Sequence, residues 1–284
     1  MESSNTLSEI QNQFRSQLAG LYADQEIRQI FFLCSEHVLN YSKIDTFLRS
    51  GDPISSDVAE KLTIILSRLT KWEPIQYILG VSWFYGLTIR VDHRVLIPRQ
   101  ETEELVQWII KSEGNKASKV LDIGTGSGCI AVSLAVNMPG NQVSACDIST
   151  EALALAHTNA LLNKVNVDFF SFDMLSDVTL PSKYQVIVSN PPYVREMEKK
   201  FMKPNVLHYE PSLALFVPNH DPLLYYKRIA LIARKSLLDG GILYLEINEQ
   251  FPDEIVKMLQ CTGFYGIEVK KDLNGKSRMV RARK

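Results

Sequence analysis

The residues Asn190-Pro191-Pro192-Tyr193 directly follow the apolar run Val186-Ile187-Val188 and carry the clearest chemistry in the chain. The two prolines fix φ and remove two backbone donors, so this corner presents carbonyl acceptors, to which Asn190 adds its side-chain oxygen. Two acceptors beside the Tyr193 ring suit a planar amino group with two N–H donors. We therefore predict a corner suited to methyl transfer to a conjugated nitrogen; the alternative is a plain strand end with a proline-rich turn.

A glycine-rich turn stands upstream of this corner. The run Lys119-Val120-Leu121-Asp122-Ile123 predicts a buried strand, and Gly124-Thr125-Gly126-Ser127-Gly128 separates it from a helical pattern. Such a turn lets a ligand approach the backbone and offers the N–H groups of a helix N-terminus. Cys129 stands where the dinucleotide fingerprint needs its third glycine. The turn therefore favours a ligand without a pyrophosphate, although many such turns serve packing alone.

Two acidic residues end the next two predicted strands. Asp147 lies 23 positions after Gly124, where an acid reaches the ribose hydroxyls in βαβ nucleotide sites; a helix cap is the alternative. Asp173 and Met174 suit an adenine, because the carboxylate can accept from its amine while the thioether packs on the ring. The carboxyl ends of parallel strands share one edge of a sheet, so we expect these residues, the glycine turn and Asn190 to line one cleft.

This ordered set of motifs resembles the S-adenosylmethionine-dependent methyltransferases of Rossmann type that act on amino or amide nitrogens. The chain is further similar to the HemK/PrmC family from about residue 70 to its end, and four segments carry this similarity: 96–103, 122–128, 189–193 and 209–211. The resemblance implies methylation of the side-chain amide nitrogen of the glutamine in the Gly-Gly-Gln loop of class 1 peptide-chain release factors.

The resemblance also implies roles for individual residues. The catalytic corner would be Asn190, Pro191, Pro192 and Tyr193, with Tyr193 as a wall of the substrate slot. The cofactor S-adenosylmethionine would be bound by Gly124, Thr125, Gly126, Ser127, Gly128, Asp147, Asp173, Met174 and Asn190. The Asn190 Oδ1 and the Pro191 carbonyl would accept the two amide N–H bonds and stabilise the charge that develops on nitrogen. In-line positioning can supply on the order of 7–11 kcal/mol of the barrier. No general base is needed, because the methylated amide cation loses its proton readily to water or to Asn190.

Two positions depart from the family pattern. Gln100 stands where the family usually has a proline after Ile-Pro-Arg. Met174 stands where an aromatic residue is common, so thioether packing would replace ring stacking on the adenine. Neither departure removes an atom that the chemistry requires.

The length of 284 residues predicts two domains. Residues 1–75 show helical periodicity and are interpreted as a small helical bundle, which by resemblance helps to hold the release factor. Residues 76–98 contain an aromatic and β-branched stretch that predicts a β-hairpin linker. Residues 99–284 would form the methyltransferase domain, an α/β Rossmann-like class I sheet that is mostly parallel with an antiparallel last strand. Within it, residues 194–222 lack periodicity and are predicted to be a loop.

Local motifs predict several element ends. Asp57 and Glu60 have the spacing of a capping box, which predicts the start of a helix. Gly240-Gly241 follows a helical pattern and is interpreted as its cap. Asn274-Gly275 predicts the turn of a final hairpin.

The composition and charge of the chain indicate which kinds of partner to expect. The net charge of −1 gives no bulk attraction to nucleic acid, and no stable nucleic-acid partner is expected. Residues 270–284 hold seven basic side chains against one acidic residue, Asp272. This indicates a solvated edge hairpin or a contact with ribosomal RNA or the release factor, so ribosome proximity stays open.

The four cysteines lack paired spacing and the five histidines lack ligand spacing, which predicts a reduced chain without a metal. No apolar run approaches a membrane span and no leader precedes the chain, so a cytoplasmic protein without a membrane partner is expected.

Two other functions remain open from sequence. An adenine amino-methyltransferase acting on DNA or RNA would use the same tetrapeptide, with a flipped base stacked on Tyr193. The near-neutral charge and the lack of a sizeable basic recognition domain oppose it. A cofactor-binding or ribosome-associated module without turnover is the other alternative, and the intact glycine turn and tetrapeptide oppose that one.

Overall fold

The computed structural model describes residues 5–114, 118–176, 179–180 and 182–284. The chain forms two compact units. One comprises Met1–Gly80 with Lys203–Tyr209, and the other comprises Val81–Met202 with Glu210–Lys284. Along the described ranges, every helix is too short or too polar to cross a membrane.

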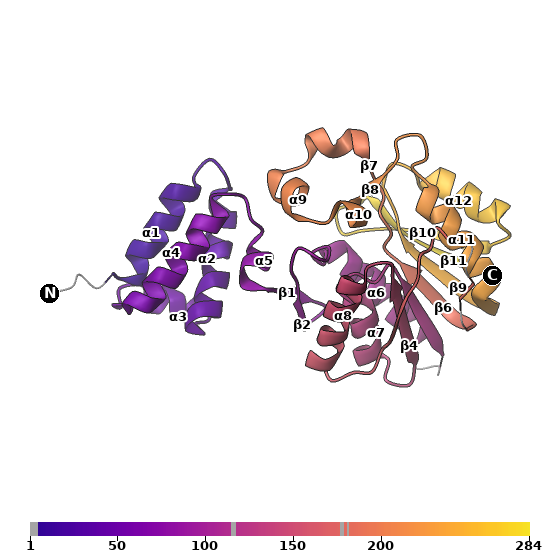
Figure 1. Ribbon diagram of the computed structural model, residues 1–284, viewed down its shortest axis with the longest axis horizontal. Helices are drawn as coiled ribbons and strands as arrows, with labels where there is room; N and C mark the ends of the chain where they lie inside the picture. The colour runs from indigo at the N-terminus through magenta and orange to yellow at the C-terminus, as the bar shows by residue number, and fades with distance from the viewer. Residues whose placement is uncertain (1–4, 115–117, 177–178, 181) are drawn as a thin grey trace. The chain divides into compact units, whose positions relative to one another are not determined.

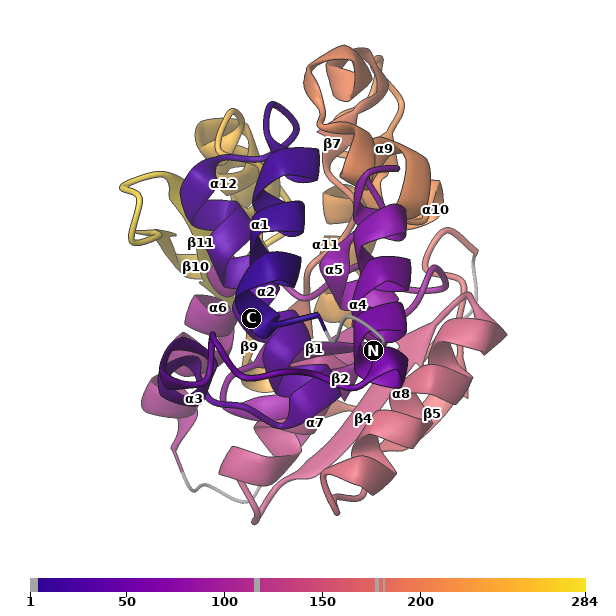
Figure 2. The ribbon, with the colours of Figure 1, turned by 90° about the vertical axis from the view of Figure 1, so that its left-hand side faces the viewer.

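The first unit is helical, as its periodicity predicts. It contains α1 (Leu7–Leu18), α2 (Asp24–Leu39), α3 (Lys43–Leu48), α4 (Ser56–Leu69), α5 (Ile75–Leu79) and α9 (Pro204–Tyr209). Helices α1, α2 and α4 lie side by side (Figures 1 and 2) and bury their apolar faces against one another. The rings of Phe14 and Phe31 meet edge to face with centroids 5.2 Å apart. The Tyr209 hydroxyl donates to the Lys71 carbonyl at 2.8 Å and ties α9 to the end of α4.

The predicted capping box at the start of α4 is wrong. The N-cap is Ser55, whose hydroxyl accepts from the Val58 N–H at 3.3 Å. Asp57 lies in the first turn of the helix, where a negative charge is favourable, and its carboxylate pairs with Lys61 at 2.8 Å.

The second unit begins with an antiparallel hairpin, as the aromatic and β-branched residues there predict. Strands β1 (Val81–Phe84) and β2 (Leu87–Arg90) pair across a turn at Tyr85 and Gly86, both of which have positive φ. The Asn159 side chain accepts from the Arg90 N–H at 2.7 Å and donates to the Arg90 carbonyl at 3.0 Å. One buried amide thus joins the end of the hairpin to the helix that carries Asn159.

A seven-stranded sheet forms the centre of this unit, in the order β10-β11-β9-β6-β3-β4-β5. Its strands are β3 (Lys119–Ile123), β4 (Gln142–Asp147), β5 (Asp168–Ser171), β6 (Tyr184–Ser189), β9 (Leu237–Glu246), β10 (Tyr265–Lys271) and β11 (Ser277–Arg283). The five strands from β5 to β9 are parallel, while β11 runs antiparallel to β9 and to β10. This confirms the predicted class of fold, a mostly parallel α/β sheet with an antiparallel end.

Helices cover both faces of the sheet (Figure 1). Helices α6 (Gln100–Glu113), α7 (Cys129–Asn137) and α8 (Thr150–Leu162) lie on one face, and α11 (Leu224–Ser236) and α12 (Pro252–Cys261) on the other. Successive side chains of a strand point to opposite faces. Leu243 and Leu245 of β9 therefore join the core with α11 and α12, whereas Tyr244 and Glu246 face α6.

Two predictions about irregular segments are wrong. Residues 194–222 are not a structureless loop; they contain β7 (Val194–Arg195), η1 (Glu196–Phe201), α9, α10 (Ser212–Leu215) and β8 (Phe216–Val217). Elements this short show no periodicity in a sequence. Gly240-Gly241 does not cap α11 but lies within β9. A Cβ on Gly241 would stand 2.9 Å from the Leu238 carbonyl oxygen and 3.1 Å from that of Gln185, so close backbone approach requires the glycine.

Candidate active site

The register of the central strands sets four residues in a row at the carboxyl edge of the sheet. Ile123 at the end of β3 pairs with Cys146 on β4 and with Ser189 on β6. Ser189 pairs in turn with Leu245 on β9. The next residue of each strand therefore lies in this row: Asp147, Gly124, Asn190 and Glu246. The chain reverses its direction across the sheet at β3, the switch point where open α/β sheets bind ligands.

A cavity opens at this edge. The predicted residues that line it are Gly124, Thr125, Gly126, Ser127, Asp147, Asp173, Met174, Asn190 and Pro192. Gly128, Pro191 and Tyr193 lie outside its lining. The structure thus brings together at one cavity most of the glycine turn, both acidic strand ends, and Asn190 and Pro192 of the tetrapeptide. The sequence missed other lining residues, among them Arg94, Thr102, Phe172, Leu213 and Tyr225.

The glycines of the turn serve different purposes. Gly124, Gly126 and Gly128 all have positive φ, at 72°, 54° and 79°. A Cβ on Gly128 would lie 2.9 Å from the Ala156 Cβ, so this glycine lets α7 and α8 pack closely. A Cβ on Gly126 would meet no protein atom within 4 Å, so its backbone borders open space. A ligand can approach the chain at Gly126 without a side chain in the way.

Asp147 is held by the backbone around it. Its Oδ2 accepts from the Gly126 N–H at 2.9 Å and its Oδ1 from the Ser149 N–H at 3.0 Å. Burial raises the pKa of Asp147, and these N–H groups oppose the rise. The alternative of a helix N-cap is wrong, because Ser149 caps α8 through its hydroxyl. A carboxylate has further lone pairs, so Asp147 can still accept from two ligand hydroxyls.

Flat and apolar side chains line the far part of the cavity. Phe172 and Met174 come from the segment after β5, and Tyr225 from the first turn of α11. The Met174 Cε lies 3.4 Å from the position that a Cβ on Gly124 would take, so the thioether packs on the glycine turn. Asp173 Oδ1 accepts from the Leu175 N–H at 2.8 Å. These walls can hold a planar ring with a carboxylate at its edge.

Asp122 lies beneath the glycine turn and is fully buried. The Thr125 hydroxyl donates to its Oδ2 at 2.6 Å, while its Oδ1 has no hydrogen-bond partner among the described residues. Burial, and to a lesser extent the charge of Asp147, raises the pKa of Asp122 to about 7, against the effect of the Thr125 hydrogen bond.

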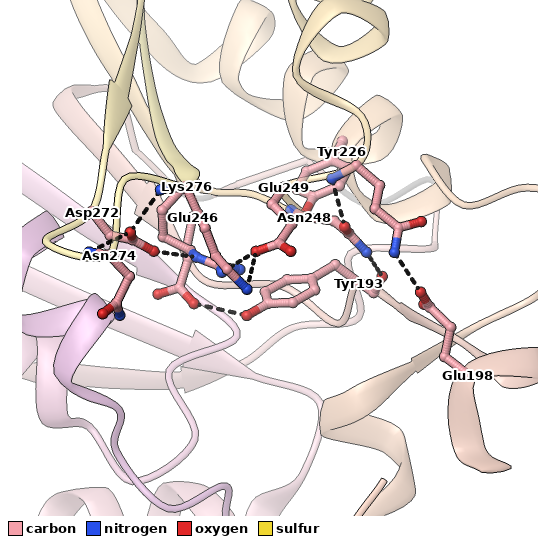
Figure 3. Close-up of polar contacts among 11 residues, drawn as sticks. Tyr193, Glu198, Tyr226, Glu246, Asn248, Glu249, Asp272, Asn274 and Lys276 are labelled. Atoms are coloured by element: carbon pink, nitrogen blue, oxygen red, sulfur yellow. Dashed lines mark hydrogen bonds and ion pairs between the residues drawn. The ribbon is translucent and has the colours of Figure 1, made fainter. Parts of the chain in front are cut away.

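Asn190 is tied to a buried carboxylate through a hydroxyl. Its Nδ2 donates to the Thr102 Oγ1 at 3.2 Å, and the Thr102 hydroxyl donates to the Glu246 Oε2 at 2.6 Å. The Tyr193 hydroxyl donates to the other oxygen of Glu246 at 3.0 Å (Figure 3). Burial raises the pKa of Glu246, and the two hydroxyl donors oppose that rise. Neither Glu246 nor Thr102 is among the site residues predicted from sequence, although Thr102 lies in the 96–103 segment.

A second layer of hydrogen bonds holds the tetrapeptide from behind (Figure 3). Asn248 Nδ2 donates to the Tyr193 carbonyl at 3.0 Å, and the Asn248 N–H donates to the buried Tyr226 hydroxyl at 3.0 Å. Asn248 thus holds the backbone of Tyr193, whose hydroxyl stays on Glu246. Elsewhere in Figure 3, Asp272 accepts from the N–H groups of Asn274 and Lys276 within the last hairpin, both at 2.9 Å.

Several basic side chains of the last hairpin are paired. Arg278 bridges Asp272 at 3.2 Å and Glu249 at 2.8 Å. Arg281 pairs with Glu268 at 2.6 Å. The excess positive charge of this segment is therefore partly neutralised within the unit.

An ion pair joins two segments that line the cavity. Arg99 pairs with Glu210 at 2.6 Å, and the same carboxylate accepts from the Ile97 N–H at 3.1 Å. The Glu210 side chain is 1% exposed. It anchors the segment that brings Pro211 and Leu213 to the cavity, beside Arg99 itself.

The groups that line the cavity fit S-adenosylmethionine. The open backbone at Gly126, the carboxylate of Asp147 and the apolar walls around Met174 match a nucleoside joined to an amino-acid chain. Within the described ranges, no group of three or more His, Cys, Asp and Glu side chains is arranged to hold a metal ion. Together with the sheet order, these features define a class I S-adenosylmethionine-dependent methyltransferase.

Comparisons with known proteins agree. A methyltransferase from Pyrococcus furiosus superimposes with a TM-score of 0.51 at 18% identity, over 70% of this chain and 89% of that one. The Thermus thermophilus 16S rRNA N2 G1207 methyltransferase gives 0.51 at 16% identity, over 72% of this chain and 49% of that one. Both show the fold. Residues 9–80 match the PrmC N-terminal domain family, and residues 100–208 match the methyltransferase small domain family.

Relatives with assigned functions show the family. The release factor glutamine methyltransferase of Flavobacterium psychrophilum is 43% identical over 95% of this chain and 96% of its own length. That of Bacteroides thetaiotaomicron is 44% identical over 94% and 96%. The chain belongs to the release factor glutamine methyltransferase family.

Proposed function

We propose that this enzyme transfers the methyl group of S-adenosylmethionine to the side-chain amide nitrogen of the glutamine in the Gly-Gly-Gln loop of class 1 peptide-chain release factors. One observation carries the proposal for the site: Asn190 Nδ2 is committed to Thr102, so its Oδ1 is left for a substrate N–H beside the cofactor cavity. Membership in the family supports the choice of substrate.

The chemistry needs orientation more than acid–base help. An amide nitrogen is a weak nucleophile because its lone pair is delocalised into the carbonyl. Asn190 Oδ1 and the Pro191 carbonyl would accept its two N–H bonds and turn one face of the nitrogen toward the methyl donor. When bound, S-adenosylmethionine supplies a methyl group on a positively charged sulfur, which is a good leaving group. The two acceptors stabilise the positive charge that grows on nitrogen, whose proton then leaves to water.

The cofactor would lie along the row of strand ends. Asp147 would accept from the ribose hydroxyls, since its carboxylate is already oriented by two backbone N–H groups. Asp173 would accept from the adenine amine, with Met174 packed on the ring. The backbone of the glycine turn at Gly126 would border the amino-acid part. Gly124 at the start of the turn and Asn190 are neighbours in the sheet register, so both would border the part of the cofactor that carries the methyl group.

The helical unit would help to hold the release factor. Ile44, Phe47 and Leu48 of α3 are 71%, 78% and 73% exposed, an apolar group suited to a protein surface. The segments assigned from sequence as 1–75, 76–98 and 99–284 would then serve as substrate-holding bundle, connector and methyltransferase domain.

A methyl-transfer assay tests the function. Labelled S-adenosylmethionine is offered with a release factor, with its Gly-Gly-Gln→Gly-Gly-Ala variant, and with a mixed DNA and RNA pool. We expect label on the native factor alone. Label on the nucleic acid, with none on the factor, would contradict the proposal and favour an adenine amino-methyltransferase.

A further inference from the structure

We propose that Glu246 and Thr102 are positioning residues that decide which end of the Asn190 amide faces the cavity. The inference rests on the proposed function, in which Asn190 Oδ1 accepts a substrate N–H bond. Glu246 is 1% exposed and lies outside the lining of the cavity, and it accepts from the hydroxyls of Thr102 and Tyr193. Its link to Asn190 runs through Thr102, so it acts on Asn190 rather than on the substrate.

The number of protons shared among Glu246, Thr102 and Asn190 fixes the orientation of the Asn190 side-chain amide. A carboxylate has no proton, so both hydroxyls around Glu246 must donate to it: Thr102 at 2.6 Å and Tyr193 at 3.0 Å. The Thr102 hydroxyl has only one proton and has given it to Glu246, so its oxygen can only accept. The group at 3.2 Å from that oxygen must then be the Asn190 amine, and Oδ1 turns to the opposite side.

A neutral side chain at position 246 would remove this constraint. A glutamine amide offers both donors and an acceptor. The Thr102 hydroxyl is then able to accept from position 246 and donate to Asn190 Oδ1. In that arrangement Asn190 presents its Nδ2 group to the cavity. The N–H bonds of Asn190 and of the substrate amide would then point at one another, and neither would find an acceptor there.

Regular secondary structure brings Glu246, Thr102 and Asn190 together. The register Ser189↔Leu245 places Glu246 next to Asn190 in the sheet. Thr102 comes from the first turn of α6, which crosses the same face of β9. The three residues therefore meet through one strand pair and one helix.

The same helix and strand supply a matched control. Two residues earlier on β9, the Tyr244 hydroxyl donates to Glu113 at the end of α6, at 2.5 Å. Glu113 is also a buried glutamate that accepts a hydroxyl, but no hydrogen bond joins this pair to Asn190 in the described part of the chain. Glu113→Gln thus makes the same chemical change without touching the orientation of Asn190.

The test compares kcat, the KM for the release factor and the Kd for S-adenosylmethionine in four single variants and one double variant of the whole enzyme. We expect Glu246→Gln and Thr102→Val each to lower kcat on the order of tenfold to a hundredfold, because a misaligned amide loses the reactive geometry. Thr102→Ser keeps the hydroxyl and should stay within about threefold of wild type, as should Glu113→Gln. The Kd for the cofactor should change by less than about threefold throughout.

The double variant tests whether the two residues act through one chain. Because either change alone breaks it, Thr102→Val with Glu246→Gln should be no slower than the slower single variant. Losses that multiply, or a Thr102→Val enzyme with wild-type kcat, would overturn the inference. Equal losses of kcat in Glu113→Gln and Glu246→Gln would also overturn the inference. They would indicate that any change of a buried glutamate between α6 and β9 lowers kcat.

The outcome is separable from that of the proposed function. If the wild-type enzyme fails to methylate the release factor, the proposed function fails first. If the wild type is active and the variants match it, only the positioning role is wrong. Should Glu246→Gln fail to fold by circular dichroism, two variants decide the question alone: Thr102→Val, which replaces the hydroxyl of the wild type by a methyl group, and Thr102→Ser, which keeps the hydroxyl.

Discussion

Two carboxyl groups are buried on the same face of the sheet near its carboxyl edge, and they differ in what surrounds them. Glu246 accepts a hydroxyl on each oxygen. Asp122 accepts one from Thr125, and its other oxygen has no hydrogen-bond partner among the described residues. Burial raises the pKa of both groups. We infer that the surroundings of Glu246 suit an ionised carboxylate, which orients the groups that donate to it. The surroundings of Asp122 suit a carboxyl group that takes a proton near neutral pH.

The largest expected effect lies at the end of the chain of contacts from Glu246. Asn190→Ala removes the acceptor for a substrate N–H and should lower kcat by about 10²–10³-fold, the usual loss for one preorganised polar group. Single-turnover rates at saturating cofactor measure this, with the cofactor Kd as the control. Adding Glu246→Gln to Asn190→Ala should lower the rate no further; a further loss would mean that Glu246 acts by another route.

The second prediction concerns Asp122 and the stability of the fold. Its pKa is about 7 in the folded chain, against about 3.9 when unfolded. Below the unfolded pKa the group is protonated in both states and costs nothing. Between the unfolded and the folded pKa the unfolded chain is ionised while the folded carboxyl keeps its proton, so stability falls as the pH rises, and the loss is complete above the folded pKa.

We expect Asp122 to lower the free energy of unfolding by about 2–4 kcal/mol between pH 4 and pH 8. Urea denaturation across this range measures the slope for wild type and Asp122→Asn. The slope should be shallower in the variant, whatever its stability at one pH. An identical slope would show that Asp122 stays ionised or that its neighbour Asp147 carries the titration.

The third prediction concerns the acid side of the pH–rate profile. Burial raises the pKa of Glu246, the hydrogen bonds from Thr102 and Tyr193 and the charge of Arg278 lower it, and Glu101 raises it. When Glu246 takes a proton it becomes a donor, and the orientation of Asn190 is no longer enforced. The kcat should therefore fall toward acid pH, by up to about tenfold per pH unit.

Glu246→Gln is the control for this limb. It lacks the titrating group, so its kcat should be lower at neutral pH and flatter toward acid. A limb of unchanged shape in this variant would assign it to another group, such as one on the release factor.

The smallest effect tests the surroundings of Asp122. Thr125→Val removes the side-chain donor to the Asp122 carboxylate that is found among the described residues, a hydrogen bond that lowers the pKa of Asp122. The pH midpoint of the stability loss should move upward, and the fold should lose roughly 1 kcal/mol at neutral pH. Thr125→Ser keeps the hydroxyl and should leave the midpoint in place. A midpoint that moves equally in both variants would indicate a packing effect.

Much of the sheet and of the cofactor cavity was predictable because their signals are local. A buried parallel strand such as Lys119–Ile123 is a short, largely apolar run, and it appears with the predicted bounds. A glycine turn and a strand-end acid stand beside such runs in sequence. Since parallel strands share an edge, placing Gly124, Asp147 and Asn190 in one cleft required no knowledge of distant contacts.

The rest depends on contacts between distant segments. Thr102 and Glu246 are separated by 144 residues, and only the crossing of α6 over β9 brings them together. Tyr225 looks like any helix residue until α11 places it at the cavity. The short elements between 194 and 222 are held by tertiary contacts such as Arg99–Glu210, which no periodicity reports.

The most direct test of the account is to locate the transferred methyl group by tandem mass spectrometry of the release factor after one turnover. We predict a single methyl group on the side-chain nitrogen of the glutamine in the Gly-Gly-Gln loop, formed by the wild type and almost absent with Asn190→Ala. A methyl group on another atom of the factor, or one formed equally well by Asn190→Ala, would contradict it.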